Sequence, residues 1–338
     1  MGNDSRQLGW ALIGCGSAGR EHARGAVADA DIAVRGFCDI EPAAAAAVAG
    51  EHDGAWHTTD PVRVFSDPEI DVVSIATAHD SHADLAIAAL QAGKHLFLEK
   101  PMAMTSADCV RIEAAREAAD RRLMLNHSIR FSGAARAIRD RLGPIMVSHG
   151  QCTMAPADLN RWRWHPTQGG GTVYDVGVHA LDLLCWMHRD HPVEVYATGG
   201  AVRHPEELRG TGLLDTIAAT LRFADGGAAT FLMADAGQNE LTGKWFFEFF
   251  DGSDSAVLHE HFRAATITRR DPETGEDDSE TLRPEPAARF APLVAAIRAG
   301  TGTPVGPAEG IRTALLVELI LESIATGQPQ RWSEPASA

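Results

Sequence analysis

One short stretch near the N-terminus constrains the fold of this chain more than any other. Three glycines, Gly14, Gly16 and Gly19, stand in the pattern G-x-G-x-x-G. An apolar run of strand length precedes them at residues 10–13, and a helical spacing of side chains follows at residues 20–29. Strand, tight turn and helix form the context in which this pattern is typical of dinucleotide binding. The first glycine permits the turn, the second lets a pyrophosphate approach the backbone, and the third lets the helix pack on the strand.

The second expected strand, residues 34–38, points to NAD as the cofactor. It leads into Asp39, twenty residues past Gly19. A carboxylate at this place accepts hydrogen bonds from both hydroxyls of an adenosine ribose and repels a 2′-phosphate. The neighbouring Ile40 offers no cation that would hold that phosphate. We therefore expect NAD rather than NADP, with a glycine-rich turn that binds no ligand as the alternative.

Composition sets broad limits on the partners. The chain has 338 residues, enough for two domains, and a net charge of −16, which argues against nucleic acid or an anionic membrane as a partner. The five cysteines are scattered without a C-x-x-C pair, as expected for reduced thiols in the cytoplasm. No signal peptide and no run long enough to cross a bilayer is apparent. We expect a cytoplasmic protein with a small-molecule substrate.

Strand-like and helix-like segments alternate up to about residue 125. This alternation is typical of a parallel, doubly wound α/β sheet, whose ligands bind outside the carboxyl ends of the strands. Further strands are expected at 71–76, 95–98 and 123–125, and helices at 41–51, 84–92 and 105–121. We therefore expect a Rossmann dinucleotide-binding domain over residues 1–125, with the loop 77–82 and the segment 99–100 at its ligand edge.

The pattern changes near Asn126. Segments of strand length separated by turns predict an α+β domain over residues 126–338 with a large open mixed or antiparallel sheet. The expected strands are 145–154, 193–202, 215–223, 228–234, 245–250, 256–259 and 265–269. Residues 271–280 are acidic and are expected to form a solvated loop, and two helices are expected at 287–299 and 309–326. With helices on one side only, the other side of the sheet would remain bare and would pair with another subunit.

Two segments carry residues suited to chemistry. Lys100 follows a parallel strand, where its ammonium can donate to a substrate oxygen, and Glu99 could orient it or hold the nicotinamide ribose. Asp175 and His179, four residues apart after a run of three glycines, share a helix face, and a carboxylate near a histidine raises its basicity. Arg163 lies upstream as a further cation. The alternatives are a surface Lys–Glu pair and a structural Asp–His pair.

A metal site is not expected. His79 and His82 have a spacing that could suit a metal, but no third ligand follows at a sensible distance. No nucleophile motif with a nearby base is present either.

Together these motifs resemble the Gfo/Idh/MocA family of NAD(P)-dependent dehydrogenases, the glucose–fructose oxidoreductase and inositol dehydrogenase group. The resemblance rests on residues 14–19, 77–82 with 93–95, 99–103, and 169–182. It implies Lys100, Asp175 and His179 as the catalytic residues, with His179 taking a proton from a substrate hydroxyl. The implied substrate contacts are Lys100, Arg163, Asp175 and His179. The implied cofactor contacts are Gly14, Gly16, Ser17, Ala18, Gly19, Asp39, Ile40, Thr77, Ala78, His79, His82, Glu99 and Lys100.

The resemblance also implies a homodimer or homotetramer built through the second-domain sheet. Where the family usually has Thr-Pro-Asn, this chain has Thr77-Ala78-His79. The expected function is hydride transfer between a secondary alcohol of a cyclitol, sugar or sugar derivative and the nicotinamide. The alternatives are an NAD-retaining glycoside hydrolase and, ranked last because the catalytic residues are present, a non-catalytic NAD-binding regulator.

Overall fold

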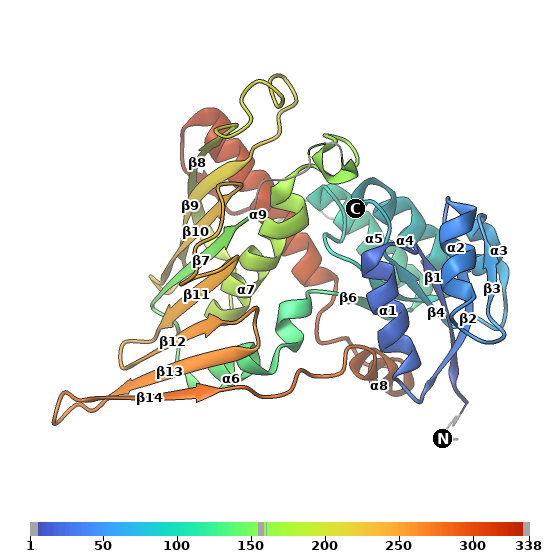
Figure 1. Ribbon diagram of the computed structural model, residues 1–338, viewed down its shortest axis with the longest axis horizontal. Helices are drawn as coiled ribbons and strands as arrows, with labels where there is room; N and C mark the ends of the chain where they lie inside the picture. Colours follow the sequence, from blue (N-terminus) through green and yellow to red (C-terminus); the bar gives the residue numbers. More distant parts are fainter. Residues whose placement is uncertain (1–5, 155–158, 160, 334–338) are drawn as a thin grey trace. The chain divides into compact units, whose positions relative to one another are not determined.

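The computed structural model describes residues 6–154, 159 and 161–333. The chain forms two compact units (Figure 1). The first contains residues up to Asn126 together with residues 288–311, and the second contains 127–287 and 312–334. The second unit is not continuous in sequence, because residues 288–311 pack with the first unit.

The first unit is built on a six-stranded parallel sheet in the order β3-β2-β1-β4-β5-β6. This order reverses direction between β1 and β4, as in doubly wound folds. Its strands are β1 (Leu8–Ile13), β2 (Ile32–Cys38), β3 (Trp56–Thr58), β4 (Val72–Ile75), β5 (His95–Leu98) and β6 (Leu123–Leu125). Its helices are α1 (Ser17–Val27), α2 (Pro42–Ala49), α3 (Pro61–Ser66), η1 (His79–Ser81), α4 (His82–Gln91), α5 (Ser106–Ala119) and α8 (Ala291–Ala299).

The register of this sheet brings four strand ends to one level. Ile13 at the end of β1 pairs with Cys38 of β2 and with Ile75 of β4, and Ile75 pairs with Leu98 of β5. The residues that follow these strands therefore emerge side by side. They are Gly14, Asp39, Ala76 and Glu99.

The second unit is built on a nine-stranded mixed sheet in the order β14-β13-β12-β11-β7-β10-β9-β8-β15. Its strands are β7 (Val147–Thr153), β8 (Pro192–Gly200), β9 (Thr216–Phe223), β10 (Ala228–Ala234), β11 (Trp245–Phe250), β12 (Asp254–His259), β13 (Ala264–Arg270), β14 (Asp277–Leu282) and β15 (Gln330–Arg331). Its helices are η2 (Ser128–Phe131), α6 (Gly133–Arg141), η3 (Trp162–Trp164), the π-helical turn η4 (Val173–Gly177) and α7 (Val178–His188). Helix α9 (Pro307–Thr326) begins in the first unit and continues into the second.

The two faces of the large sheet differ in burial. Helix α7 packs on β7 and β10, and α6 packs on β12 and β13 (Figure 1). Side chains alternate between buried and exposed along β9 and β10. Phe247 and Phe249 are fully buried, whereas Phe250 of the same strand is 42% exposed. The helices thus cover one face and leave the other open within this chain, as the sequence predicts.

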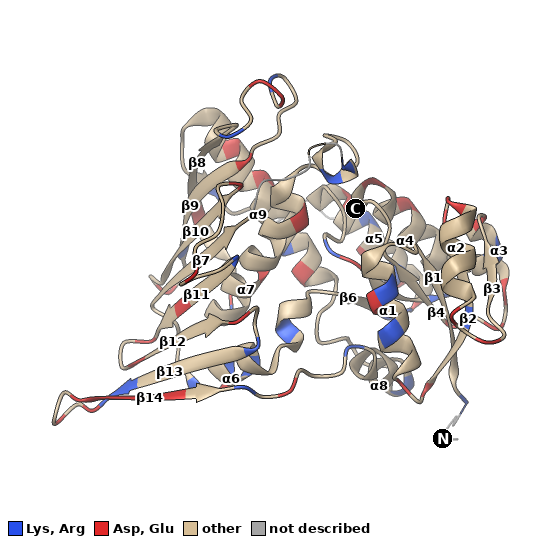
Figure 2. Ribbon diagram, viewed as in Figure 1, with Lys and Arg blue, Asp and Glu red and all other residues tan. Residues whose placement is uncertain are grey.

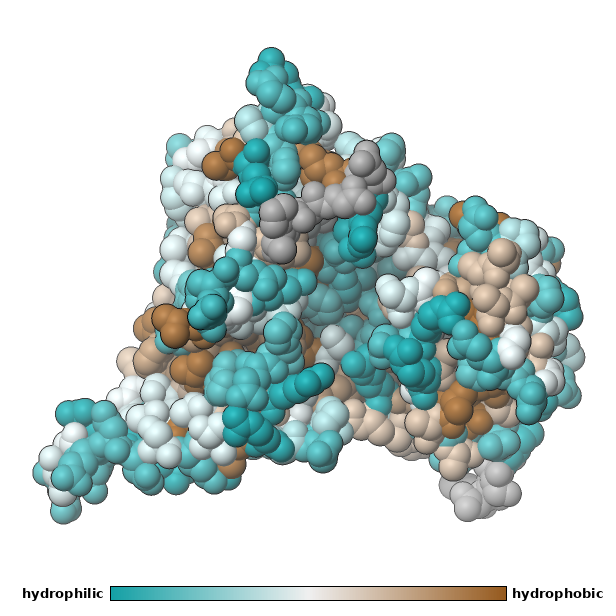
Figure 3. Space-filling view, viewed as in Figure 1, coloured by the Kyte–Doolittle hydropathy of each residue, from teal (hydrophilic) through white to brown (hydrophobic). Residues whose placement is uncertain are grey.

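One expected loop is a strand. Residues 277–280, the second part of the loop expected at 271–280, belong to β14 (Asp277–Leu282) at the edge of the sheet. Arg269 and Arg270 of β13 stand opposite Asp278 and Asp277 of β14, and Arg270 pairs with Asp277 at 3.1 Å. Blue and red segments face each other along this hairpin in Figure 2, and its tip is hydrophilic in Figure 3. The strand exists because its partner supplies opposite charges across the ladder.

Candidate active site

The three glycines of the turn differ in what surrounds them. Gly14 has a φ of +96°, and a Cβ there would lie 2.5 Å from the carbonyl oxygen of Ala76, so only glycine fits. A Cβ on Gly19 would lie 1.9 Å from the carbonyl oxygen of Gly14, which shows how closely α1 packs on the turn. Gly16 has open space where its side chain would be. This arrangement fits a pyrophosphate lying over Gly16.

Helix α1 begins directly after this open position. Its N-cap residue is Gly16, which has no side chain that could cap the first N–H groups. Ser17 is exposed and Ala18 is half-buried. The uncapped N–H groups at the start of the helix suit an anion.

Asp39 connects the glycine turn to the end of β2. Its Oδ2 accepts a hydrogen bond from the backbone N–H of Cys15 at 2.7 Å, and its Oδ1 accepts one from Glu41 at 2.9 Å. Each carboxylate oxygen keeps further acceptor capacity for a ribose hydroxyl. The adjacent Ile40 is 86% exposed, a large apolar side chain left at the surface.

The buried side chain of His82 contacts the loop that follows β4. The side chains of Thr77 and Ser81 bond to each other at 2.7 Å, and Thr77 and Ala78 are half-buried. His82 is 0% exposed, with Nδ1 at 2.7 Å from the carbonyl oxygen of Pro101 and Nε2 at 3.3 Å from that of Thr77. Burial lowers the pKa of His82, although both carbonyl contacts oppose this. His82 thus braces two loops from inside and does not face the surface where it was expected to contact the cofactor. His79 is buried as well, at 4% exposure.

Glu99 and Lys100 follow β5. Lys100 is half-buried, whereas Glu99 is 9% exposed and turns its carboxylate into the protein. There it meets two residues that sequence reasoning missed, His22 and Asn126. The only signal for His22 was a histidine on the otherwise small and apolar face of α1.

In the second unit, the glycine run positions Arg163 on Asp175. The N–H of Gly171 donates to the carbonyl oxygen of Arg163, and a Cβ on Gly169 would lie 2.2 Å from the Arg163 Cα. The backbone that packs closely against these glycines is therefore that of the turn η3 of the same chain. The Arg163 guanidinium lies 3.0 Å from the Asp175 carboxylate.

His179 lies one helical turn beyond Asp175, and both are half-buried. Its ring meets Trp245 edge-on, with centroids 6.1 Å apart. Phe262 packs behind Trp245 at 5.1 Å and belongs to three consecutive residues with positive φ, which are Glu260, His261 and Phe262. Non-glycine residues adopt this left-handed conformation at a cost. Contacts of Phe262 with Trp245 and Phe247, and the hydrogen bond from Ser132 Oγ to its carbonyl oxygen, hold this turn.

Helix α7, which carries His179, is anchored by a buried ion pair. Asp182 receives two hydrogen bonds from Arg130, at 2.8 and 2.6 Å, and both residues are buried. Burial raises the pKa of Asp182, but the charges of Arg130 and His127 outweigh it, so that the pKa lies below its usual value.

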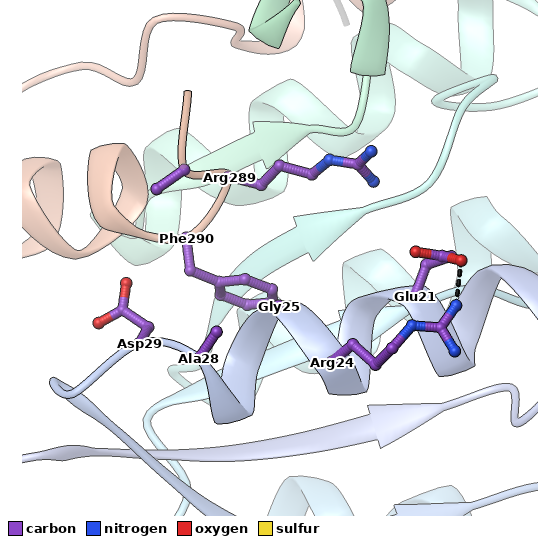
Figure 4. Close-up of a pocket in the computed structure, with 8 residues that line it drawn as sticks. Glu21, Arg24, Gly25, Ala28, Asp29, Arg289 and Phe290 are labelled. Atoms are coloured by element: carbon purple, nitrogen blue, oxygen red, sulfur yellow. Dashed lines mark hydrogen bonds and ion pairs between the residues drawn. The ribbon is translucent and has the colours of Figure 1, made fainter. Parts of the chain in front are cut away.

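A cavity of about 340 Å³ opens beside α1. It runs along α1 beside Arg24, Gly25 and Phe290 (Figure 4). No residue predicted for the site lines it. Among the described residues, no group of three potential metal ligands comes together, and none of the described helices has both the length and the apolar character needed to cross a membrane.

Comparison with known proteins decides the family. Residues 8–127 match the family model described as "Oxidoreductase family, NAD-binding Rossmann fold", and residues 134–243 match "GFO/IDH/MocA C-terminal domain". The chain is 30% identical over 334 residues to 1,5-anhydro-D-fructose reductase of Ensifer adhaerens, covering 94% of this chain and 97% of that protein. The chain belongs to the Gfo/Idh/MocA family. It is an oxidoreductase, and its first unit is an NAD-binding Rossmann domain, as the sequence predicts.

Other members of the Gfo/Idh/MocA family are similar over part or all of the chain. Inositol 2-dehydrogenase of Rhizobium meliloti (strain 1021) is 29% identical over 226 residues, which cover 64% of this chain and 65% of that protein. The structure of levoglucosan dehydrogenase in complex with NADH and levoglucosan superposes with a TM-score of 0.86 at 23% identity, covering 96% of this chain and 99% of that one. This likeness confirms the fold of both units.

Proposed function

We propose that the chain is an NAD-dependent dehydrogenase that acts on a secondary alcohol of a cyclitol, sugar or sugar derivative. One observation carries the proposal. This chain, a member of the family, has Lys100 at the ligand edge of its parallel sheet, and in its second unit Arg163 pairs with Asp175, one helical turn before His179. The relatives named above are a reductase of anhydrofructose and a dehydrogenase of inositol. Both act on hydroxyl or carbonyl groups of polyols or sugars, which supports this class of substrate.

The proposed roles follow from the chemistry of the side chains. His179 takes the proton of the substrate hydroxyl, because imidazole is a base near neutral pH. Asp175 accepts from the substrate while Arg163 holds its carboxylate in place at 3.0 Å. Lys100 donates to the same substrate oxygen. When bound, the nicotinamide of NAD supplies the hydride acceptor.

The cofactor preference is part of the proposal. Asp39 accepts from the ribose hydroxyls, and Ile40 packs against the adenine. The glycine turn, Thr77 and Ala78 contact the phosphates and the nicotinamide half. Because Asp39 and Glu41 are both acidic, a 2′-phosphate meets repulsion at this place.

The open face of the nine-stranded sheet supports an assembly of two or four copies. Small or uncharged side chains stand on this face along the neighbouring strands β8, β9 and β10. These are Tyr196, Thr198, Ala218, Thr220, Thr230 and Leu232. A second copy that places the same face against this one would cover them.

The test is NADH formation measured by absorbance across inositols, aldoses and sugar acids, with Lys100→Met as the matched variant. We expect one polyol to be oxidised, and Lys100→Met to lower kcat by about 10²–10⁴-fold while NAD affinity stays within a few-fold, because the change removes a proton-path group and leaves the ribose contacts. Turnover of Lys100→Met at the wild-type rate would contradict the role of Lys100. Turnover of a glycoside without net NADH would instead favour a hydrolase.

A further inference from the structure

Three buried polar side chains from three separate elements meet beneath Lys100. His22 comes from the middle of α1, whereas Glu99 and Asn126 are the residues that follow β5 and β6. His22 is 1% exposed and Asn126 is 4% exposed. The Nε2 of His22 lies 2.9 Å from Glu99 Oε1, and the Nδ2 of Asn126 donates to the same oxygen at 2.6 Å.

The direction of these hydrogen bonds follows from the charge of Glu99. Burial raises its pKa, but the hydrogen bond and charge of His22, the charge of Lys100 and the Asn126 hydrogen bond outweigh burial. The pKa of Glu99 therefore lies well below its usual value, and the side chain is a carboxylate at neutral pH. An ionised carboxylate only accepts hydrogen bonds, so the Nε2 of His22 carries the hydrogen.

The second carboxylate oxygen acts on Lys100. The backbone N–H of Lys100 donates to Glu99 Oε2 at 3.1 Å. On the other side of Lys100, the carbonyl oxygen of Pro101 meets the Nδ1 of His82 at 2.7 Å. The backbone is therefore held by buried polar groups at the N–H of Lys100 and at the carbonyl of the following residue. His22 contributes to the first of these two contacts through Glu99.

Packing leaves His22 little freedom to leave this arrangement. Its ring lies against Phe97 with centroids 4.6 Å apart and meets the edge of Phe290 at 6.5 Å. Because α1 begins at the glycine turn, a displacement of this helix moves His22 with it. Among the described residues, the Nδ1 of His22 and the Oδ1 of Asn126 are buried without a hydrogen-bond partner. The position of His22 is therefore fixed by its bond to Glu99 and by the packing of its ring.

We propose that His22 is a positioning residue that acts through Glu99, alongside Asn126, to fix the backbone of Lys100, and so connects the dinucleotide-binding helix with the catalytic lysine. The proposal rests on the function proposed above, in which Lys100 is catalytic. It assigns the Glu99 carboxylate to orienting the lysine and not to holding the nicotinamide ribose. It also gives His22 a role in kcat without any contact with the substrate.

The kinetic test compares His22→Phe with His22→Gln. Phenylalanine keeps the ring between Phe97 and Phe290 but removes the N–H, whereas the glutamine amide nitrogen reaches the position of Nε2 and restores a donor. We expect His22→Phe to lower kcat by about 10–100-fold, as misplacing a reacting group does, with the NAD Kd within a few-fold. His22→Gln restores most of the rate. In the Lys100→Met background, His22→Phe causes no further loss, because the two changes remove the same contribution.

The matched control is His52→Phe, which makes the same substitution in the same unit. His52 stacks on Phe37 with centroids 5.1 Å apart, away from Lys100. Its kcat is expected to equal that of the wild type. Wild-type kcat in His22→Phe, an equal loss in the wild-type and Lys100→Met backgrounds, or a loss in NAD affinity in place of kcat would each overturn the proposal.

A second measurement needs neither turnover nor cofactor. The chain has three lysines, Lys94, Lys100 and Lys244. Acylation of the purified protein by acetic anhydride, read peptide by peptide by mass spectrometry, gives the reactivity of Lys100 relative to Lys244. We expect this ratio to rise in His22→Phe and to stay unchanged in His22→Gln and His52→Phe. An unchanged ratio in His22→Phe would overturn the positioning role even if the enzyme proved to have another reaction.

The two proposals fail in different ways. A wild-type protein that oxidises no polyol, or a fully active Lys100→Met, would contradict the proposed function. An active wild type that loses turnover in Lys100→Met but keeps it in His22→Phe would contradict only the role of His22.

Discussion

At the scale of single residues, Asp39 is where cofactor choice can be tested most directly. Both of its oxygens accept backbone N–H groups next to the glycine turn. We expect Asp39→Ala to weaken NAD binding by about 10–100-fold, because one or two hydrogen bonds to a charged acceptor are lost. We also expect the ratio of NAD affinity to NADP affinity to fall. Fluorescence titration with both cofactors measures this. Asp29→Ala, which removes another acidic residue of the same unit, is the control, and an unchanged NAD preference in Asp39→Ala would place Asp39 off the ribose.

A second residue gives the protein a dependence on pH. His188 stacks on Phe223 with centroids 3.9 Å apart, and its Nε2 lies 2.9 Å from Ser148 Oγ. Burial lowers its pKa from 6.5 to about 4, although the charge of Asp225 opposes this. Between these two values the unfolded chain binds a proton that the folded chain does not. The contribution of His188 to the free energy of unfolding is therefore fully present above pH 6.5. It falls by about 3 kcal/mol in all as the pH drops toward 4.

The measurement is urea unfolding of the wild type and of His188→Phe from pH 8 to pH 4. We expect the free energies of unfolding to run parallel above pH 7 and the wild-type curve to fall more steeply below pH 6.5. Equal slopes over the whole range would show that His188 does not titrate as its burial implies.

At the scale of elements, a buried ion pair anchors α7. Asp182 and Arg130 are both buried and make two hydrogen bonds. Removing one partner leaves an uncompensated buried charge, so Asp182→Ala is expected to lower the free energy of unfolding by about 3–5 kcal/mol. The double variant Arg130→Met with Asp182→Leu is expected to lose less than Asp182→Ala alone. Urea unfolding measures these variants together with the single variants Arg130→Met and Asp182→Leu. A double variant whose loss equals the sum of the losses in these two single variants would show that the two residues act independently.

Most elements near the site are predictable from local pattern, and the exceptions have physical causes. The strand β1, the turn at Gly14 and Asp39 follow from side-chain spacing and turn chemistry, because each is a local property. The strand β14 was missed because its polar residues pair with arginines on β13, a partner that spacing cannot identify. The contact between the glycine run and Arg163 was missed for the same reason, since it joins separate turns.

At the scale of the whole molecule, the two-part organisation is predictable but the path of the chain between the parts is not. The change from alternating strands and helices to successive strands marks the boundary near Asn126. Residues 288–311 return to the first unit because Phe290 packs on Trp10 and Phe97, with centroids 6.1 and 4.6 Å apart. The apolar face of α8, read from the sequence, does not indicate which of the two units the helix packs on. The buried contact of His22 with Glu99 is not predictable from the local sequence pattern either, because the two residues are 77 positions apart.

The last prediction concerns assembly through the open face of the nine-stranded sheet. Ala218 and Thr230 are exposed on neighbouring strands of this face, and the side chains around them carry little charge. If a second copy covers this face, an arginine at each of these positions would bury unpaired charge at the interface and repel its symmetry mate. We expect light scattering coupled to size exclusion to give a dimer or tetramer for the wild type and a monomer for Ala218→Arg with Thr230→Arg. Ala47→Arg, on the exposed side of α2, is the control and keeps the wild-type mass. An assembly that survives the double substitution would have to use another surface, and the open sheet would then need a different occupant.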